Sequence, residues 1–216
     1  MSEHHKKETA YERVLFFSDA IVAIAITLLA LELRIEVPEE RCISFSDLLA
    51  PWHKYIAFIL SFINIAGLWR THHTSFIYIK KMDDRMLFLN ITWLFFIVTL
   101  PFSTSVLSDH FGDTPAVFLY SLNIFLLSVM QNFIWDYPDL KEGYMNTENL
   151  DDQLHERMRL GLNFDMLNGI IAVVLSFFMP KTAFFLLFFK IPIIFFVAIL
   201  TRKKKRKKIT KKAGSE

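Results

Sequence analysis

Long apolar runs separated by short charged stretches constrain this chain more than any other feature of its sequence. Of its 216 residues 53% are hydrophobic and 21% are charged, and the mean hydropathy is still +0.35. The charged residues must therefore be segregated from the apolar runs, as expected where lipid covers most of the surface. The sequence predicts an integral membrane protein.

Six of these runs approach the length that a membrane helix needs. A hydrocarbon core about 30 Å thick is crossed by about 20 helical residues. The runs lack the polar and apolar alternation of a barrel strand, and backbone groups in lipid must be paired within their own segment. We therefore expect an all-α fold. Its six transmembrane helices are expected over residues 11–33, 52–79, 87–107, 115–135, 160–179 and 183–200.

Basic residues flank these runs unequally. With the N-terminus in the cytoplasm, the basic residues on the outer side are only Arg34, Arg41, Lys54 and Lys181. Those on the cytoplasmic side are Lys6, Lys7, Arg13, Lys80, Lys81, Arg85, Lys141, Arg157, Arg159 and the whole C-terminal tail. Because cytoplasmic flanks carry the excess of Lys and Arg, we expect both termini to be cytoplasmic.

The domain organisation follows from the same pattern. Residues 1–200 form one membrane domain, and residues 201–216 form a basic cytoplasmic tail that we expect to be disordered. The tail is interpreted as an orientation signal, with anionic lipid headgroups as the alternative partner and no nucleic acid expected. No soluble segment is large enough for a separate active site, so an enzyme is not expected. Cys42 is the one cysteine and has no intrachain partner.

Polar clusters interrupt the first two apolar runs at similar depths. A charged group at the centre of a span costs about 2.5–3.5 kcal/mol, so each needs a partner or a water-filled path. Ser18 and Asp19 lie about 10 Å from the inner end of their run, at 1.5 Å per residue, and the segment Trp69–His73 lies at a comparable depth in the next.

Since the two helices run antiparallel, Asp19 is placed to accept hydrogen bonds from Arg70, His72, His73 or the Trp69 indole. The network is interpreted mainly as glue between helices, with direct ion binding or proton relay by Asp19 or the histidines as the alternative.

Two further features concern the remaining spans and the free side of the first helix. Lys190 lies in the middle of the sixth run, just before Pro192, and is interpreted as snorkelling towards an interface.

At 100° per residue, an arc of the first helix well away from Asp19 carries Ala20, Ile24, Thr27, Leu28 and Leu31. Such a stripe is common in helix packing, but its composition also suits a pore that closes by dewetting.

Arg13, Phe17, Ser18 and Asp19 form a signature of Arg, three residues, then Phe-Ser-Asp, and residues 20–29 continue it as Ala-Ile-Val-Ala-Ile-Ala-Ile-Thr-Leu-Leu. Together with the later Trp69 and His73, this resembles the transmembrane protein 175 family of potassium channels, in its single six-span form of the bacterial or archaeal type. The specific motifs occupy the first two helices, whereas the six-span layout agrees over the whole membrane region.

The resemblance implies a modestly selective potassium channel without the Thr-Val-Gly-Tyr-Gly filter of ordinary potassium channels. Its pore is expected to be lined by the first helix of each subunit, with Ile24 as the constriction and Leu28 and Leu31 extending it outward. Thr27 is expected to contact the permeant K⁺ transiently. No other metal and no cofactor is implied.

The same resemblance assigns a structural role to a second set of residues, Arg13, Ser18, Asp19, Trp69 and His73. A single six-helix unit implies a homotetramer, and a bacterial-type chain implies the plasma membrane.

Three alternatives remain open at this point. A proton-coupled secondary transporter would use Asp19 with His72 and His73, although the Gly and Pro interruptions typical of broken helices are sparse. A membrane enzyme is disfavoured because His72 and His73 are adjacent rather than spaced i, i+4 as in a zinc-binding HExxH motif. A non-conducting scaffold is the third.

Overall fold

The computed structural model describes residues 3–35, 41–146 and 150–188, with side chains from Ala10 onward. Within these residues the regular structure is helical, apart from one isolated antiparallel bridge between Ile79 and Met145. The prediction of an all-α fold is confirmed over this part of the chain.

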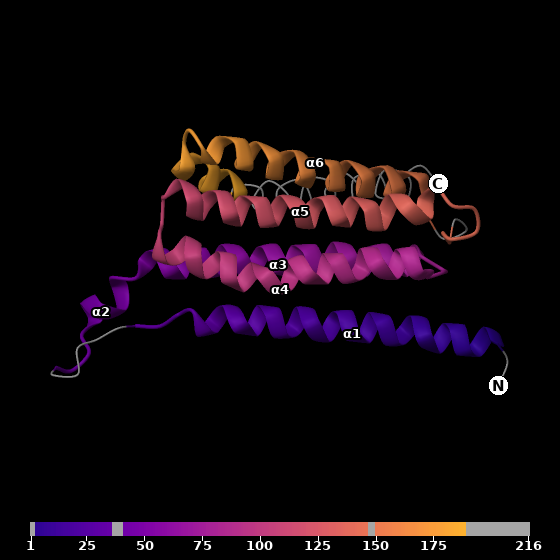
Figure 1. The fold of residues 1–216 in the computed structure, drawn as a ribbon, viewed down its shortest axis with the longest axis horizontal. Helices are drawn as coiled ribbons and strands as arrows, with labels where there is room; N and C mark the ends of the chain where they lie inside the picture. The colour runs from indigo at the N-terminus through magenta and orange to yellow at the C-terminus, as the bar shows by residue number, and fades with distance from the viewer. Residues whose placement is uncertain (1–2, 36–40, 147–149, 189–216) are drawn as a thin grey trace, which may run out of the picture.

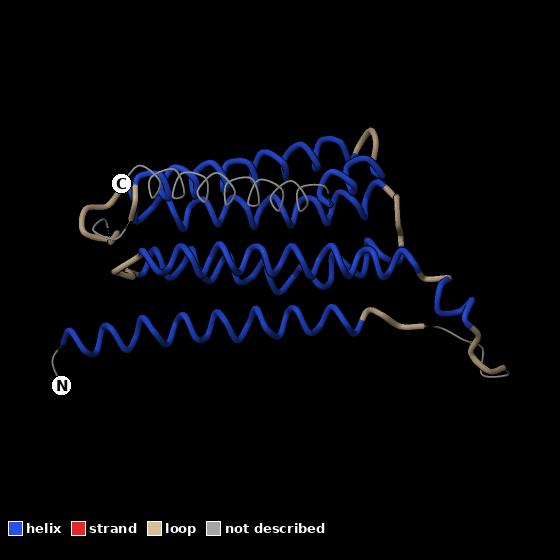
Figure 2. The backbone as a smooth tube through the Cα atoms, turned by 180° about the vertical axis from the view of Figure 1, so that it is seen from behind, coloured by secondary structure: helices blue, strands red, loops and turns tan. Residues whose placement is uncertain are grey.

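Five long helices run through the described residues. They are α1 (Glu3–Leu31), α3 (Trp52–Tyr78), α4 (Asp84–Asp109), α5 (Thr114–Asp139) and α6 (Asp152–Ser176), with the short α2 (Phe45–Leu49) between α1 and α3. Residues 180–188 are also helical. The long helices lie roughly parallel or antiparallel to one another, as Figures 1 and 2 show from opposite sides.

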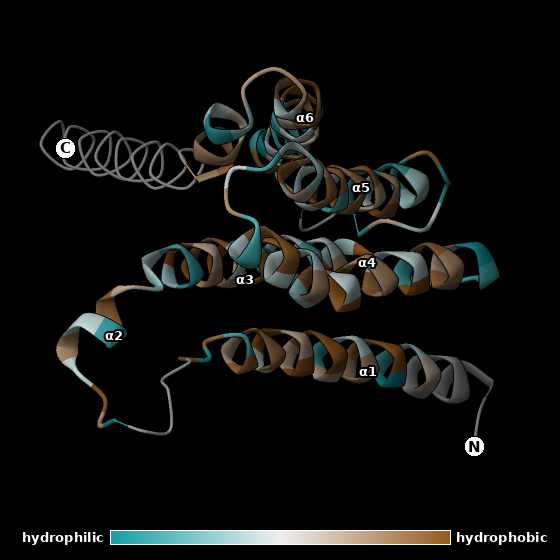
Figure 3. Ribbon diagram, turned by 60° about the vertical axis from the view of Figure 1, so that its left-hand side comes forward, coloured by the Kyte–Doolittle hydropathy of each residue, from teal (hydrophilic) through white to brown (hydrophobic). Residues whose placement is uncertain are grey.

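The helices are arranged in layers, with α1 along one side, α3 and α4 next to it, then α5, and α6 on the opposite side (Figure 1). The fully buried large side chains Trp93, Trp135 and Tyr120 come from α4 and α5. Large apolar side chains are exposed along α1, α4 and α6, and Figure 3 shows apolar residues along the outer surfaces of the helices. The core therefore lies between α3, α4 and α5, and apolar surface also faces outward, as lipid or further protein requires.

Among the described residues, four helical segments are long and apolar enough to cross a membrane: residues 10–31 of α1, and all of α4, α5 and α6. Helix α3 has the length, with 27 residues, but Asn64, Arg70 and His72 lower its mean hydropathy. An integral membrane protein is thus supported. The predicted sixth span lies mostly outside the described residues, as do Lys190 and the basic tail. The span count and the orientation of the termini stay predictions.

Helices α5 and α6 extend beyond the spans expected from the sequence. Part of the segment between the spans expected at 115–135 and 160–179 is helical, because α5 continues to Asp139 and α6 begins at Asp152. Asp151 caps α6 by accepting a hydrogen bond from Gln153 N at 3.4 Å. Apolar runs mark only the part of a helix that lipid covers, so polar turns beyond the membrane escape a hydropathy-based prediction.

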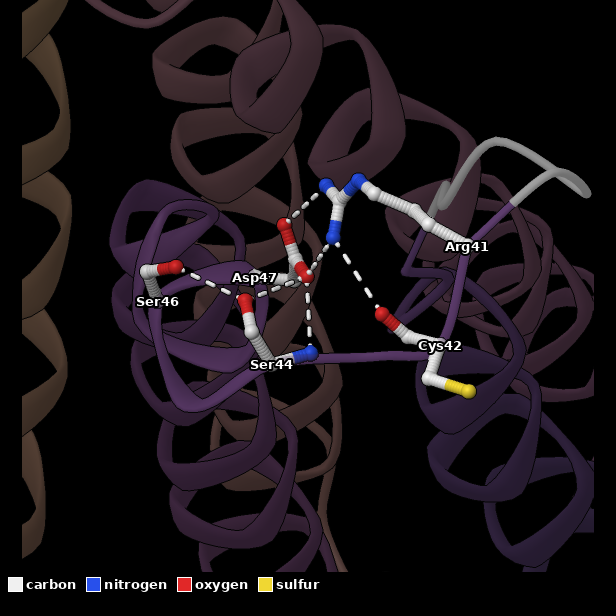
Figure 4. Close-up of polar contacts among 5 residues, drawn as sticks. All are labelled: Arg41, Cys42, Ser44, Ser46 and Asp47. Carbon is white, nitrogen blue, oxygen red and sulfur yellow. Dashed lines mark hydrogen bonds and ion pairs between the residues drawn. The ribbon is translucent and has the colours of Figure 1, made fainter.

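The loop that carries α2 is held by one carboxylate, Asp47, shown in Figure 4. Asp47 accepts two hydrogen bonds from the Arg41 guanidinium, at 2.6 and 2.7 Å, and further bonds from the backbone N–H and hydroxyl of Ser44. Hydrogen bonds from Arg41 and Ser44 hold the pKa of Asp47 below its usual range. Cys42 lies in this loop as a free, exposed thiol.

A second carboxylate, Asp83, joins the two loops at the end of the bundle where α1 begins, which we call the N-terminal end. Asp83 caps α4 by accepting from Met86 N at 2.9 Å. It also accepts hydrogen bonds from the Tyr137 hydroxyl at 2.5 Å, from Lys141 Nζ at 2.8 Å and from the Tyr144 hydroxyl at 3.1 Å. The bridge between Ile79 and Met145 lies alongside, so the α3–α4 loop is attached to the α5–α6 loop.

The Asp83 contacts shift two pKa values in opposite directions. Burial raises the pKa of Asp83, but hydrogen bonds from Lys141, Tyr137, Met86 N and Tyr144 outweigh it and bring the pKa well below the usual range. The bond to Asp83, followed by contacts with Tyr144 and Tyr137, raises the pKa of Lys141. The ion pair is therefore charged across the physiological pH range.

We predict that Asp83→Asn lowers the free energy of unfolding by about 1–2 kcal/mol, because the helix cap is kept but the charge-assisted hydrogen bonds are weakened. Thermal unfolding in detergent, followed by circular dichroism, measures the change. Asp84→Asn is the matched control, since Asp84 is the exposed neighbour. An equal loss in both variants would contradict the role of Asp83.

The Asp83–Lys141 ion pair also predicts how the stability difference between wild type and Asp83→Asn depends on pH: it should hardly change near neutral pH. A lowered carboxylate pKa contributes stability above the unfolded value, about 3.9, and loses it as pH falls through the folded value. A raised lysine pKa contributes fully below about 10.4 and loses it as pH rises through the folded value. The difference between wild type and Asp83→Asn should therefore be constant from about pH 5 to pH 9 and shrink in stronger acid. Unfolding at a series of pH values checks this.

Candidate functional site

Helix α1 has a buried face and a free face. The buried side chains Ser18, Val22, Ala25 and Leu29 are spaced by four, three and four residues, as one side of a helix requires. They pack against α3 and α4, so the other side of α1 is left open. One face of α1 is therefore fixed by packing against α3 and α4, and the opposite face is left open for contacts outside this chain.

The predicted stripe lies on the free face. Ile24 is 58% exposed, Leu31 59% and Leu28 38%, and Thr27 is also exposed. The Thr27 hydroxyl donates its hydrogen to Ile24 O at 2.8 Å, within the helix. This leaves the lone pairs of the Thr27 oxygen unused, and an oxygen lone pair is what a partly dehydrated cation needs. The roles of these four residues stay predictions.

One contact between α1 and α3 is made by Asp19 and Trp69. The Trp69 indole donates to Asp19 Oδ1 at 2.8 Å, and the Trp69 ring stacks on His73 with centroids 5.5 Å apart. The sequence left four hydrogen-bond donors to Asp19 open, and in the structure the donor is the Trp69 indole. His73 contributes by holding the Trp69 ring rather than by bonding Asp19.

A second contact joins three helices through buried side chains. Asn90 of α4, which is fully buried, donates from Nδ2 to Ser18 Oγ of α1 at 2.9 Å. Its Oδ1 lies 2.8 Å from His72 Nε2 of α3. Since an amide oxygen only accepts, His72 Nε2 carries the hydrogen. The His72 ring also stacks on Trp93, with centroids 4.2 Å apart, so His72 is fixed by α4 rather than by Asp19.

Two further hydrogen bonds fasten the ends of α1. At the N-terminal end the Tyr11 hydroxyl lies 2.9 Å from both Phe76 O and Ile79 O of α3. At the opposite end the Ser105 hydroxyl of α4 donates to Glu32 Oε2 at 2.6 Å. Helix α1 is thus attached to the α3 and α4 layer near both ends and in the middle.

The predicted network is only partly assembled in one chain. Ser18, Asp19, Trp69 and His73 lie in the contacts above, whereas Arg13 is exposed and forms no hydrogen bond or ion pair with any of them. Arg13 instead lines an open groove of about 340 Å³ between α1 and α4. Among the described residues, no group of three or more His, Cys, Asp or Glu side chains is arranged to hold a metal ion.

Sequence reasoning missed Asn90, the residue that joins the three helices. A signal was present, because Asn90 is an amide within a predicted span, near its inner end. Which face of its helix Asn90 occupies depends on packing, and a single sequence does not give that orientation.

We predict that Asn90→Ala lowers the free energy of unfolding by about 2–3 kcal/mol, since Ser18 and His72 each lose a buried partner. Detergent-solubilised protein unfolded by heat gives the measurement. Thr92→Ala is the control on the same helix, because its exposed hydroxyl bonds only Phe88 O. Ser18→Ala combined with Asn90→Ala should cost less than the sum of the two single changes. Additive losses would show that the two side chains are not coupled.

Comparison with known proteins agrees with the family signature. A sequence profile described as the endosomal/lysosomal potassium channel TMEM175 matches residues 13–101, which include residues 13–31 of α1, all of α3 and Asn90. A potassium channel from Streptomyces collinus is 27% identical over 169 residues, covering 76% of this chain and 82% of that protein. A potassium channel from Chamaesiphon minutus is 33% identical over 132 residues, covering 58% of this chain and 64% of that protein.

Vertebrate relatives are longer. The endosomal/lysosomal proton channel TMEM175 of Gallus gallus is 33% identical over 143 residues, which are 61% of this chain and 28% of that protein. The matched part of this chain therefore corresponds to less than a third of the vertebrate protein.

Solved structures are also similar. The crystal structure of a lysosomal potassium-selective channel TMEM175 homolog from Chamaesiphon minutus has a TM-score of 0.71 and 26% identity, covering 88% of this chain and 97% of that chain. That structure agrees in fold over nearly its full length, and the profile match contains the first-helix signature. By these matches, the chain is similar to the transmembrane protein 175 (TMEM175) family over residues 13–101 and in its fold.

Proposed function

We propose that this chain is a cation channel with a modest preference for K⁺, formed by four copies around a pore lined by α1. The observation that carries the proposal is the free apolar face of α1, which a single chain leaves uncovered while the opposite face is hydrogen-bonded to α3 and α4. Relatives named as potassium channels support the choice of ion. We place the channel in the plasma membrane.

The proposed constriction is a ring of Ile24 side chains. Apolar rings close a narrow pore by excluding water, and they admit a partly dehydrated cation when the ring is wider. Leu28 and Leu31 continue the apolar lining one and two turns further along α1. The hydrogen bond from Thr27 to Ile24 O turns an oxygen lone pair, rather than a hydrogen, toward the cation.

Selectivity in this arrangement comes mainly from the cost of dehydration. The larger K⁺ loses water more easily than Na⁺, and one hydroxyl oxygen per copy offers little compensation for the lost hydration shell. We therefore expect a modest preference for K⁺ over Na⁺. The proposed pore needs no enzymatic step and no cofactor other than the permeant ion.

Protons are the second candidate for the permeant ion, because the vertebrate relatives are named as proton channels. The related alternative is a proton-coupled transporter using Asp19, His72 and His73. Asp19 is bonded to the Trp69 indole and His72 to Asn90, so a titrating cycle would have to break these contacts. Flux strictly coupled to a proton gradient would favour the transporter, and proton flux without coupling would favour a proton channel.

We predict that Ile24→Asn raises K⁺ flux into liposomes by about tenfold, because an amide hydrates the constriction and lowers its barrier by about 1.4 kcal/mol. A potassium-sensitive dye inside the vesicles gives the readout. Ile170→Asn is the matched control, since Ile170 is an exposed apolar residue of α6 on the far side of the molecule. Unchanged flux, gating and selectivity in Ile24→Asn would remove Ile24 as the constriction.

A further inference from the structure

Three cations and two tyrosine rings lie together at the N-terminal end of the bundle. Lys141 Nζ lies 4.3 Å from the centroid of the Tyr144 ring and 5.3 Å from that of the Tyr137 ring. Lys81 Nζ lies 5.8 Å from the Tyr144 centroid, and the Arg85 guanidinium lies 5.3 Å from the Tyr137 centroid. The two rings meet edge to face, with centroids 6.2 Å apart. Because a cation is attracted to an aromatic face, the rings hold these five side chains in one group, which we call the tyrosine–cation cluster.

The positive charge of the tyrosine–cation cluster is only partly compensated. Lys141 forms an ion pair with Asp83 at 2.8 Å. Lys81 and Arg85 are exposed, and in the part of the chain that the structure describes neither side chain has an ion pair or a hydrogen bond. Two cations of the cluster are therefore available to an outside anion.

The α3–α4 and α5–α6 loops that carry these cations are joined to each other. The backbone N–H of Lys80 donates to Tyr144 O at 2.7 Å, beside the bridge already described. Lys81 reaches across the junction, since its Nζ would lie 3.4 Å from a Cβ added at Gly143. Gly143 has a φ of +74°, a conformation that glycine adopts without strain. The position of the Lys81 ammonium is thus set by both loops.

The cluster lies at the polar end of two membrane spans. Helices α4 and α5 are apolar enough to span over their whole length, and the two loops lie at the same end of the bundle (Figure 1). Phe88, three residues or about 4.5 Å along α4 from Arg85, is 66% exposed. Leu140, the neighbour of Lys141, is 81% exposed. Such side chains suit lipid acyl chains, so the cluster lies at the boundary between hydrocarbon and headgroups.

Phosphate is the anion that this boundary supplies. A guanidinium binds phosphate oxygens through paired N–H donors, and an ammonium binds them as a point charge. Bulk charge does not decide the matter, because residues 79–85 and 140–146 contain four basic and three acidic residues. Recognition must therefore come from the placement of Lys81 and Arg85 beside the tyrosine rings.

We propose that Lys81 and Arg85 form a binding site for the phosphate of an anionic phospholipid, whose acyl chains lie along Phe88 and Leu140. The site is separate from the proposed pore, and it requires the chain to lie in a bilayer but not to conduct K⁺. A lipid bound where the two loops meet adds a counter-ion to the folded chain and so stabilises it.

The test titrates lipid into the purified full-length chain. Phosphatidylglycerol is added to detergent micelles that contain phosphatidylcholine, and the midpoint of thermal unfolding is followed by circular dichroism. We expect the wild-type midpoint to rise by several degrees and to saturate. Lys81→Gln and Arg85→Gln should each raise the apparent dissociation constant about fivefold, as expected for one basic residue at an anionic lipid surface, and the double variant should raise it about thirtyfold.

Lys80→Gln is the matched control, because Lys80 is an exposed lysine of the same loop that contacts neither tyrosine ring. It should keep the wild-type dissociation constant. The basic residues 202–212 are the same in every variant, so lipid attracted to them contributes equally throughout. A parallel titration with soluble glycerol 3-phosphate separates a lipid from a free phosphate ligand, and we expect no rise at millimolar concentration.

Four results would overturn the site. They are no rise with phosphatidylglycerol, an equal rise when phosphatidylcholine is added instead, a loss in Lys80→Gln as large as that in Lys81→Gln, and an equal rise with glycerol 3-phosphate. The third would show attraction by diffuse charge, and the fourth would make free phosphate the ligand. Native mass spectrometry of the same samples counts the retained phosphatidylglycerol, which the Lys81→Gln, Arg85→Gln double variant should lose.

Discussion

Hydrogen bonds at three heights hold α1 on the layer formed by α3 and α4, and the rest of the account depends on them. These bonds are made by Tyr11, Ser18 and Asp19 of α1 and by Glu32, the residue that follows α1. Apolar packing alone would fix α1 weakly in a membrane, because lipid tails are as apolar as leucine. Directional polar bonds fix the rotation of the helix, and with it the face that stays free.

That rotation links the family signature to the proposed pore. The signature residues Ser18 and Asp19 do not lie on the stripe of Ile24 and Thr27. They determine which way the stripe faces, since each bond constrains the same helix from a different neighbour. Asn90 has a central position here, because its amide contacts both Ser18 and His72 and so orients α1 and α3 together.

Much of this arrangement can be predicted from the sequence, for identifiable reasons. The existence of five of the long helices follows from apolar runs, and the meeting of Asp19 with Trp69 follows from helical rise in antiparallel neighbours. The partner of His72 does not follow, because depth is readable from residue number whereas the orientation of α4 is set by packing. The Asp83 contacts and the Arg41–Asp47 pair depend on loop conformation, for which hydropathy carries no signal.

The most direct test of a pore lined by the free face of α1 is a cysteine accessibility scan along that helix. Changing Cys42 to Ser gives a background without thiols, and single cysteines are placed at positions 20–31 of the reconstituted protein. K⁺ flux is then measured before and after treatment with a charged, water-soluble thiol reagent. Loss of flux should follow the helical repeat, strongest at Ile24, Thr27 and Leu31 and absent at Val22, Ala25 and Leu29. Loss of flux at the buried positions with none at Ile24 would contradict the account.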